Sequence, residues 1–319
     1  MRIGIIGPGA LGCFFAARLY LSVNEQDEIL LIDHRIERAA ELNRQGILYE
    51  SDTETERCPI PVGSSPESIG TLDVVLSCVK SYDLAKSLQF AAPLLDSDTL
   101  LLFLQNGISH LKYGEQKLLP AVPAYATSSE GVTYLAPGHI RHTGKGHTCL
   151  GFLSPGGSSG NERLEQLSTA LRNASIETSI SSDIRTQLWA KLFINVGING
   201  LTAVYNRTNG QLLTSCATRS KIKGLVREAE NVAKAMGITI EKDPVAETLT
   251  VCKRTARNIS SMLQDIRQER PTEIDAINGA VSRLGRENNV ATPFNDDIIV
   301  QIKTIEKRYL SSQTDTNEN

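Results

Sequence analysis

The sequence predicts two domains, an α/β domain with a doubly wound parallel sheet followed by an all-helical domain. Short apolar runs alternate with helical patterns through the first half of the chain, which is typical of right-handed β-α-β crossovers. Strand signals mostly stop after residue 182. We therefore expect an α/β domain over residues 1–182, a helical domain over residues 183–310 and a polar, disordered tail over residues 311–319.

The elements of the first domain follow from the pattern of apolar residues. Strands buried on both faces are apolar throughout, and the runs with this character are residues 3–6, 29–32, 72–79 and 99–104. Helical patterns follow the first two runs, at about residues 10–21 and 36–44. This alternation predicts the parallel sheet.

The pattern changes after about residue 124. Short β-rich segments are separated by Pro-Gly and Gly-Lys-Gly turns, and they cover residues 131–134, 138–142 and 148–151. We expect them to form an antiparallel meander that extends the edge of the sheet, and a helix and a short strand at 175–180 to complete the domain. Helices of the second domain are expected at about residues 184–202, 217–236, 244–257, 271–287 and 295–309.

Composition narrows the kind of protein. The chain has 319 residues, 40% of them hydrophobic and 22% charged, as in ordinary soluble globular proteins. A formal net charge of -3 gives no electrostatic basis for binding nucleic acid or a membrane surface. The six cysteines contain no Cys-x-x-Cys motif and no histidine cluster accompanies them, so we expect no metal site and no disulfides. With no secretory signal and no apolar run long enough to span a membrane, the chain is expected to be a cytoplasmic enzyme.

The segment Gly7-Pro8-Gly9-Ala10-Leu11-Gly12 joins the first predicted strand to the first predicted helix. In a G-x-G-x-x-G loop of this kind, Gly7 permits the tight turn and Gly9 lets backbone amides approach a pyrophosphate. Gly12 lets the helix pack against the strand, and the anion sits at the helix N-terminus. The context predicts a Rossmann-type site for a nicotinamide dinucleotide. A plain glycine-rich turn is the alternative.

Two residues after the second predicted strand give opposite indications about the cofactor. Asp33 has the position of the acid that accepts hydrogen bonds from the ribose 2′-hydroxyl in NAD sites, whereas Arg35 could pair with the 2′-phosphate of NADP. An Asp33 directed at the ribose would repel that phosphate. An Asp33 turned away, with His34 and Arg35 forming the pocket, would not. The alternative for Arg35 is an ordinary solvated charge at a helix start.

Two further polar residues follow predicted strands. Lys80 comes after the run at 72–79, and Asn106 comes after the run at 99–104. Both would lie at the carboxyl ends of parallel strands, where open α/β sheets bind ligands. The alternatives are a surface lysine at a helix start and, for Asn106-Gly107, a simple turn.

In the second domain, Lys191, Asn195 and Asn199 are spaced by four residues in an otherwise apolar segment. On a helix this spacing places them in one polar stripe. Buried polar groups must find partners or contact a ligand, so neighbouring backbone groups are the alternative to a ligand. Gly197 and Gly200 each weaken the helix by about 1 kcal/mol relative to alanine, as expected where another segment or a ligand packs closely.

A second polar cluster covers residues 260–266 and is followed by Pro271-Thr272-Glu273-Ile274-Asp275. Thr272 and Asp275 resemble a capping box, which would place Glu273 in the first turn of a helix. The alternative for Glu273 is a surface acid that complements the helix dipole.

Together these motifs resemble the ketopantoate reductase (2-dehydropantoate 2-reductase) family over nearly the whole chain. The resemblance is carried by the glycine loop, Val79-Lys80, Gln105-Asn106-Gly107, Gly138-His139-Ile140, Lys191-x3-Asn195-x3-Asn199, Ser261-Met262-x-Gln264-Asp265 and Pro271-Thr272-Glu273-Ile274. Several independent motifs in one order are more specific than any single motif. The resemblance implies that NADPH reduces the C2 carbonyl of ketopantoate to D-pantoate, for pantothenate and coenzyme A synthesis.

The resemblance also implies individual roles. Lys191 would be the general acid that protonates the developing alkoxide, and Glu273 would bind the hydroxyl end of the substrate and support the lysine. A nearby Glu273 would favour the charged amine and closure of the cleft would disfavour it, and the sequence does not decide between these effects. Asn195 and Asn199 would position the substrate, and Ser261 would contact its carboxylate. Lys80 would lie near the adenosine end of the cofactor. Asn106 and Glu273 would contact both the cofactor and the substrate.

One departure from the family keeps alternatives open. The family usually has an arginine just after the second strand without a preceding acid, and here the order is Asp33-His34-Arg35. An NADH-dependent reductase of another branched or aromatic 2-keto acid is therefore the main alternative to an NADPH enzyme. A non-catalytic NADP(H)-binding sensor is the second. A monomer and a homodimer both fit the sequence.

Overall fold

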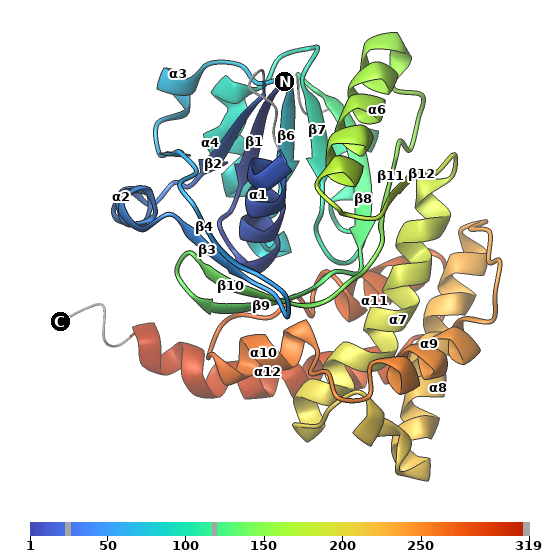
Figure 1. The fold of residues 1–319 in the computed structure, drawn as a ribbon. Coiled ribbons are helices and arrows are strands. Elements are labelled where there is room, and N and C mark those ends of the chain that lie inside the picture. The colour runs from blue at the N-terminus through green and yellow to red at the C-terminus, as the bar shows by residue number, and fades with distance from the viewer. Residues whose placement is uncertain (23–26, 117–119, 315–319) are drawn as a thin grey trace. The chain divides into compact units, whose positions relative to one another are not determined.

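The computed structural model describes residues 1–22, 27–116 and 120–314 (Figure 1). The contacts between Cα atoms divide the chain into two compact units. The first contains residues 1–105 and 110–187, and the second contains residues 106–109 and the chain from residue 188 onward. The division differs from the predicted boundary after residue 182 because it falls inside a helix, α7 (Ile184–Tyr205), rather than before it.

The first unit is built on an eight-stranded sheet in the order β12-β11-β8-β7-β6-β1-β2-β5. Its strands are β1 (Arg2–Ile6), β2 (Glu28–Ile32), β5 (Val62–Gly63), β6 (Val74–Ser77), β7 (Leu100–Phe103), β8 (Val122–Ser128), β11 (Thr148–Gly151) and β12 (Thr178–Ile180). The six strands from β8 to β5 are parallel, and β11 joins β8 in antiparallel orientation. The doubly wound parallel sheet is thereby confirmed. Its strand order reverses at β1, the point where such sheets bind dinucleotides.

A separate four-stranded sheet has the order β4-β3-β10-β9. Its strands are β3 (Ile47–Glu50), β4 (Thr55–Cys58), β9 (Gly131–Ala136) and β10 (His139–Gly144). The single meander expected from the sequence is therefore wrong, because β9 and β10 pair with each other here while β11 belongs to the large sheet. The pairing of β10 with β3 could not be predicted, since β3 and β4 lack the continuous apolar run of a buried strand.

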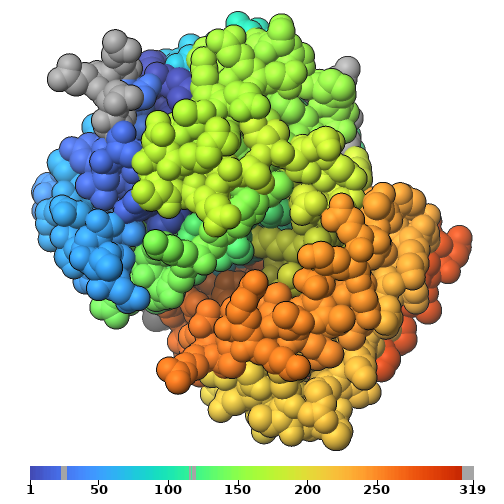
Figure 2. Space-filling view, turned by 45° about the vertical axis from the view of Figure 1, so that its right-hand side comes forward, coloured from blue at the N-terminus to red at the C-terminus, as the bar shows by residue number. Residues whose placement is uncertain are grey.

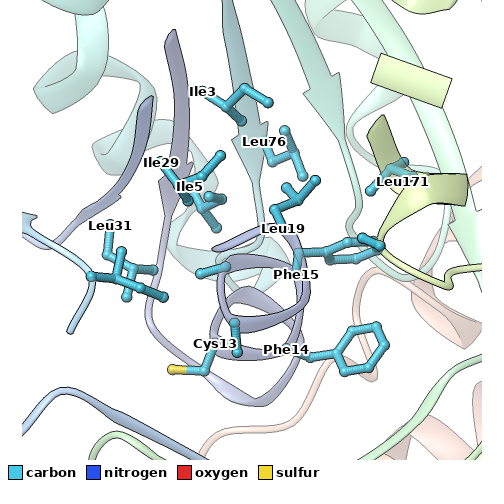
Figure 3. Packing of buried hydrophobic residues seen from close by; sticks show 14 of the residues in the cluster. Ile3, Ile5, Cys13, Phe14, Phe15, Leu19, Ile29, Leu31, Leu76 and Leu171 are labelled. Carbon is cyan, nitrogen blue, oxygen red and sulfur yellow. The ribbon is translucent and has the colours of Figure 1, made fainter. Parts of the chain in front are cut away.

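The helices of the first unit are α1 (Ala10–Ser22), α2 (Ile36–Gln45), α3 (Pro66–Ile69), α4 (Leu84–Ala91), α5 (Leu111–Glu115) and α6 (Gly157–Asn173), with short 3-10 turns η1 (Ser81–Asp83) and η2 (Ala92–Leu94). Helix α1 is the centre of the core. Its Phe14, Phe15 and Leu19 are buried with strand residues of β1, β2 and β6 and with Leu171 of α6 (Figure 3). The buried helix holds the glycine loop at its N-terminus in a fixed position. Helix α6 lies at the surface of this unit (Figure 2).

Within the described residues, the second unit contains only helices, as predicted. They are the rest of α7, η3 (Gly210–Leu213), α8 (Cys216–Ala235), α9 (Pro244–Arg254), α10 (Ser261–Arg267), α11 (Asn278–Glu287) and α12 (Pro293–Thr314). The N-terminus of α12 is fixed by the buried carboxylate of Glu228, which accepts hydrogen bonds from the amides of Phe294 (2.8 Å) and Asn295 (2.9 Å). No helix in the described part of the chain combines the length and apolar character that crossing a membrane requires.

Three expectations for this unit need correction. The predicted helix at 271–287 begins only at Asn278, and residues 271–277 form a turn. Helix α10 was not predicted, because it has only seven residues and no long periodic pattern. Residues 311–314 of the predicted tail are helical, because α12 continues to Thr314, and the remaining tail residues, 315–319, lie outside the described chain.

The two glycines of α7 permit close packing of helices. A Cβ atom on Gly197 would lie 2.7 Å from Val226 of α8 and 2.9 Å from Thr248 of α9. A Cβ atom on Gly200 would lie 2.7 Å from Ile298 of α12. At both positions the close approach expected from the sequence is therefore made by other helices of the protein. Helix α7 packs against α8, α9 and α12.

Candidate active site

The glycine loop between β1 and α1 has the backbone conformation that its sequence predicts. Gly7 has a φ of +93°, in the left-handed region that favours glycine. A Cβ atom on Gly12 would lie 2.1 Å from the carbonyl oxygen of Gly7, so only glycine fits where the helix meets the strand. At Gly9, by contrast, an added Cβ atom would meet nothing within 4 Å. The loop therefore leaves open space at the position where backbone amides approach a pyrophosphate.

This geometry separates the roles of two glycines. Gly9→Ala is expected to leave the free energy of unfolding within about 0.5 kcal/mol of wild type and to raise the Kd for NADPH by at least about tenfold, a cost of roughly 1.4 kcal/mol. Gly12→Ala is the contrasting variant, expected to destabilise the fold by about 1–3 kcal/mol through overpacking. Urea unfolding and NADPH titration measure both effects. Unchanged NADPH affinity in Gly9→Ala would show that the loop does not hold the pyrophosphate.

At the end of β2, the carboxylate of Asp33 is buried and engaged by the protein. Arg38, in the first turn of α2, donates from Nη2 to Oδ1 of Asp33 (2.8 Å) and from Nε to Oδ2. The amide of Arg35 also donates to Oδ1 (3.2 Å), while the Arg35 side chain is exposed. Arg38 was not identified from the sequence, although its position five residues after Asp33, at the start of a predicted helix, was a usable signal.

Lys80 lies where the sequence placed it, directly after β6. It precedes the 3-10 turn η1 and is partly exposed. The exposed Tyr82 follows within that turn. Lys80 thus belongs to the edge of the sheet that carries the glycine loop and Asp33, and its role near the adenosine remains a prediction.

Asn106 belongs to the second unit with residues 107–109. Gly107 has a φ of +78°, and a Cβ atom there would lie 2.0 Å from the carbonyl oxygen of Ala276. Only glycine therefore allows this short segment to pack against the turn at 271–277. The packing brings Nδ2 of Asn106 to 2.9 Å from Oε2 of Glu273, to which it donates a hydrogen bond. Asn106-Gly107 is more than a simple turn.

Glu273 is buried, with 5% of its surface exposed. The capping-box interpretation of its surroundings is wrong, because Thr272 Oγ1 accepts a hydrogen bond from the amide of Ile274 (3.3 Å) within a turn that precedes α11. The amide of Thr272 donates to the buried carboxylate of Glu306 on α12 (2.7 Å). The turn that carries Glu273 is thus fixed from α12, a support that nothing in the local sequence indicated.

Lys191 lies on α7 in the same unit as Glu273. Burial of the amine lowers the pKa of Lys191 to about 8, and the negative charge of Glu273 opposes this shift. The structure therefore answers the question that the sequence left open: burial has the larger effect. A lysine with a pKa near neutrality is suited to proton transfer, because it can donate a proton readily and still be largely protonated at neutral pH.

The remaining predicted residues also lie in the second unit. Asn195 and Asn199 follow Lys191 on α7, with Asn195 partly exposed and Asn199 buried. Ser261 is exposed in the first turn of α10, after Ser260, whose hydroxyl caps that helix by accepting from the amide of Leu263 (3.1 Å). The contacts of these three residues with a substrate remain predictions. Among the described residues, no group of three or more His, Cys, Asp or Glu side chains is arranged to hold a metal ion.

The two units carry complementary parts of one chemistry. The first presents a loop shaped for a pyrophosphate at the reversal point of a parallel sheet. The second presents a partly buried lysine under the influence of a buried carboxylate, which itself accepts a hydrogen bond from an amide. Fold and residues together define the class of nicotinamide-dependent oxidoreductases with a Rossmann-type domain and a helical domain.

Comparison with known proteins identifies the family. The family described as Ketopantoate reductase PanE/ApbA matches residues 3–155, and its C-terminal counterpart matches residues 183–306. The 2-dehydropantoate 2-reductase of Vibrio cholerae serotype O1 is 30% identical over 97% of this chain and 99% of its own length. The chain belongs to the ketopantoate reductase family, whose members are NADPH-dependent oxidoreductases that reduce 2-dehydropantoate.

Solved structures agree on the fold. A PanE/ApbA family ketopantoate reductase from Ralstonia eutropha JMP134 matches with a TM-score of 0.86 at 27% identity, over 97% of this chain and 100% of that one. A D-mandelate dehydrogenase in ternary complex with NADH and anilino(oxo)acetate matches with a TM-score of 0.87 at 26% identity, over 97% of this chain and 99% of that one. A nicotinamide cofactor is thus supported, while these two neighbours leave the choice between NADPH and NADH to other observations.

Proposed function

We propose that this chain reduces 2-dehydropantoate to D-pantoate with NADPH, in the synthesis of pantothenate and coenzyme A. The observation that carries the proposal is the partly buried Lys191 of α7, whose pKa is lowered to about 8 by desolvation while the charge of Glu273 opposes that shift. Membership of the ketopantoate reductase family names the substrate. The glycine loop and the residues after β2 hold the cofactor.

The chemical demand of the reaction explains why a lysine is needed. NADPH, when bound, supplies a hydride to the C2 carbonyl carbon, so negative charge develops on the carbonyl oxygen. The ammonium of Lys191 stabilises that charge more in the transition state than in the ground state. Lys191 then donates its proton to the oxygen and becomes a neutral amine, and D-pantoate carries the new hydroxyl group.

Glu273 affects the protonation of Lys191, and Asn106 orients Glu273. The carboxylate of Glu273 favours the ammonium form of Lys191 against the effect of burial. The Asn106 amide donates to Oε2 of Glu273 and holds the carboxylate in place. We assign the hydroxyl end of the substrate to this carboxylate. We assign the substrate carboxylate to Ser261 and the positioning of the keto acid to Asn195 and Asn199.

The pKa of Lys191 predicts how the rate depends on pH. Reduction requires the ammonium form, which is present below the pKa and is lost as the pH rises through about 8. The value of kcat/KM for reduction is therefore expected to be constant near neutral pH and to fall about tenfold per pH unit well above 8. In the reverse direction, oxidation of D-pantoate requires the neutral amine and should rise over the same range. A reduction rate that stays constant to pH 10 would contradict the assigned role of Lys191.

Product analysis tests the proposed reaction. The purified chain is incubated with 2-dehydropantoate and NADPH, and the product is identified by chiral chromatography. We expect stoichiometric D-pantoate and no L-pantoate. Tight NADPH binding without turnover of any 2-keto acid would instead support the non-catalytic sensor, which would have no need for Lys191, Asn195, Asn199, Ser261 and Glu273 together.

A second candidate is the reduction of an aromatic 2-keto acid with NADH. It is favoured by the similarity to the D-mandelate dehydrogenase that was solved with NADH and anilino(oxo)acetate. It uses the same lysine chemistry and differs in the side chain of the substrate and in the cofactor. A cytoplasmic location and the choice between monomer and homodimer stay predictions.

A further inference from the structure

The residues after β2 contain an arrangement that bears on the choice of cofactor. The carboxylate of Asp33 accepts three hydrogen bonds, two from the guanidinium of Arg38 and one from the amide of Arg35. Its side chain is only 1% exposed, whereas that of Arg38 is 25% exposed. Such a two-point pairing of guanidinium and carboxylate fixes both groups in direction as well as in distance.

This pairing removes the two properties by which an acid selects NAD. A carboxylate in this position selects NAD by accepting hydrogen bonds from the ribose 2′-hydroxyl and by repelling a 2′-phosphate. Asp33 is covered, so a ribose hydroxyl cannot reach it unless the pair opens. Its charge is balanced by Arg38 at hydrogen-bond distance, so little repulsion remains for an approaching phosphate.

The groups left exposed around the pair favour an anion. The Arg35 side chain is exposed, and the imidazole of His34 is 64% exposed with Nδ1 at 3.7 Å from Oδ1 of Asp33. Arg35 is also the N-cap residue of α2, and its own side chain does not cap the helix. Glu37, in the first turn, is the one acid of this helix start that is exposed. The exposed cation of Arg35 therefore lies beside a pair, Asp33 and Arg38, whose own charges cancel.

We propose that Arg38 determines cofactor specificity as a positioning residue: by holding and neutralising Asp33, it allows the site to accept a nucleotide with a 2′-phosphate. Arg35 is the residue that contacts the phosphate directly. The inference rests on the proposed function in taking NADPH as the cofactor. It explains how a chain with the acid of an NAD site can use NADPH.

Binding measurements test this without turnover. The Kd values of the full chain for NADPH and NADH give a preference ratio, and adenosine 2′,5′-bisphosphate against ADP isolates the adenosine end. We expect wild type to prefer NADPH. Arg38→Ala exposes the charge of Asp33 and should reduce the preference at least about tenfold, since an uncompensated like charge costs more than about 1.4 kcal/mol. Arg44→Ala, at the exposed end of the same helix, is the control for loss of one positive charge and should leave the ratio unchanged.

The double variant Asp33→Asn with Arg38→Ala decides whether Arg38 acts by neutralising Asp33 or by binding the phosphate directly. It restores the charge balance of the pair, so the ratio should return to within about threefold of wild type. If Arg38 instead bound the phosphate directly, the double variant would stay as poor as Arg38→Ala, and the proposal would be wrong. Because the double variant buries no unpaired charge, it remains informative even if Arg38→Ala alone does not fold.

The outcomes separate this inference from the function on which it rests. If wild type binds both dinucleotides and Arg38→Ala leaves their ratio unchanged, the role of Arg38 is refuted and the reductase remains. If wild type binds neither dinucleotide, the proposed function itself fails. Arg35→Ala should weaken NADPH much more than NADH, and equal weakening of both would remove Arg35 from the phosphate site.

Discussion

Replacing Lys191 by alanine is expected to lower kcat for 2-dehydropantoate by at least about a hundredfold while NADPH still binds. The lower bound follows from the usual contribution of general acid catalysis, roughly 10²–10⁴ in rate. NADPH affinity should persist because the glycine loop and the residues after β2 belong to the first unit, whereas Lys191 lies in the second. Steady-state kinetics and NADPH titration of the same preparation measure both quantities.

Two further variants show whether the loss of rate comes from the proton donor at position 191 or only from the loss of a positive charge. Lys223→Ala removes an exposed lysine from α8 in the same unit and should leave kcat unchanged. Lys191→Arg keeps a positive charge but holds its proton too tightly to act as an acid near neutral pH, so it should recover only part of the lost rate. Turnover like that of wild type in Lys191→Ala would eliminate the proposed mechanism.

Glu273→Gln is expected to be the next most damaging change. Glu273 opposes the effect of burial on Lys191, so its neutralisation should lower the pKa of Lys191 further. The fall of kcat/KM with rising pH should then begin at a lower pH than in wild type. At pH 8 we expect a loss on the order of tenfold, the size that corresponds to about one pKa unit. The pH profile of kcat/KM for reduction measures the shift.

A matched change two residues away provides the control. Asp275→Asn removes the same charge from the same turn, but the Asp275 side chain is 71% exposed and pairs with Lys303 rather than with the lysine of α7. Its pH profile should follow that of wild type. If Glu273→Gln and Asp275→Asn shift the profile equally, the effect comes from general charge in the turn and not from the charge of Glu273 acting on Lys191.

Much of this fold could be predicted because its signals are local. The apolar strands, the glycine loop and the helical second half each follow from periodicity or from a short motif. The four-stranded sheet could not be predicted, because its pairing joins β3 to β10 across about ninety residues and its strands are half-exposed. The turn at 271–277 was mistaken for a helix because Thr272 and Asp275 satisfy a capping pattern, whereas the backbone is held from α12 by Glu306.

In the candidate site, too, local patterns could be predicted and contacts between distant segments could not. Spacing on one helix was enough to place Lys191, Asn195 and Asn199 on one stripe. The contact of Asn106 with Glu273 could not be seen, since it depends on Gly107 packing against a turn that is 167 residues distant along the chain from Asn106. The hydrogen bonding of Asp33 likewise depends on three-dimensional contacts. Its partner Arg38 is near in sequence, but only the structure shows that the two side chains meet.

The central claim is that this site reduces 2-dehydropantoate with NADPH, and one comparison of substrates tests it most directly. The value of kcat/KM is measured for 2-dehydropantoate and for phenylglyoxylate, the keto acid that corresponds to mandelate, each with NADPH and with NADH. We predict the highest value for 2-dehydropantoate with NADPH. A higher value for phenylglyoxylate with NADH would contradict the claim and identify the chain as a reductase of aromatic 2-keto acids.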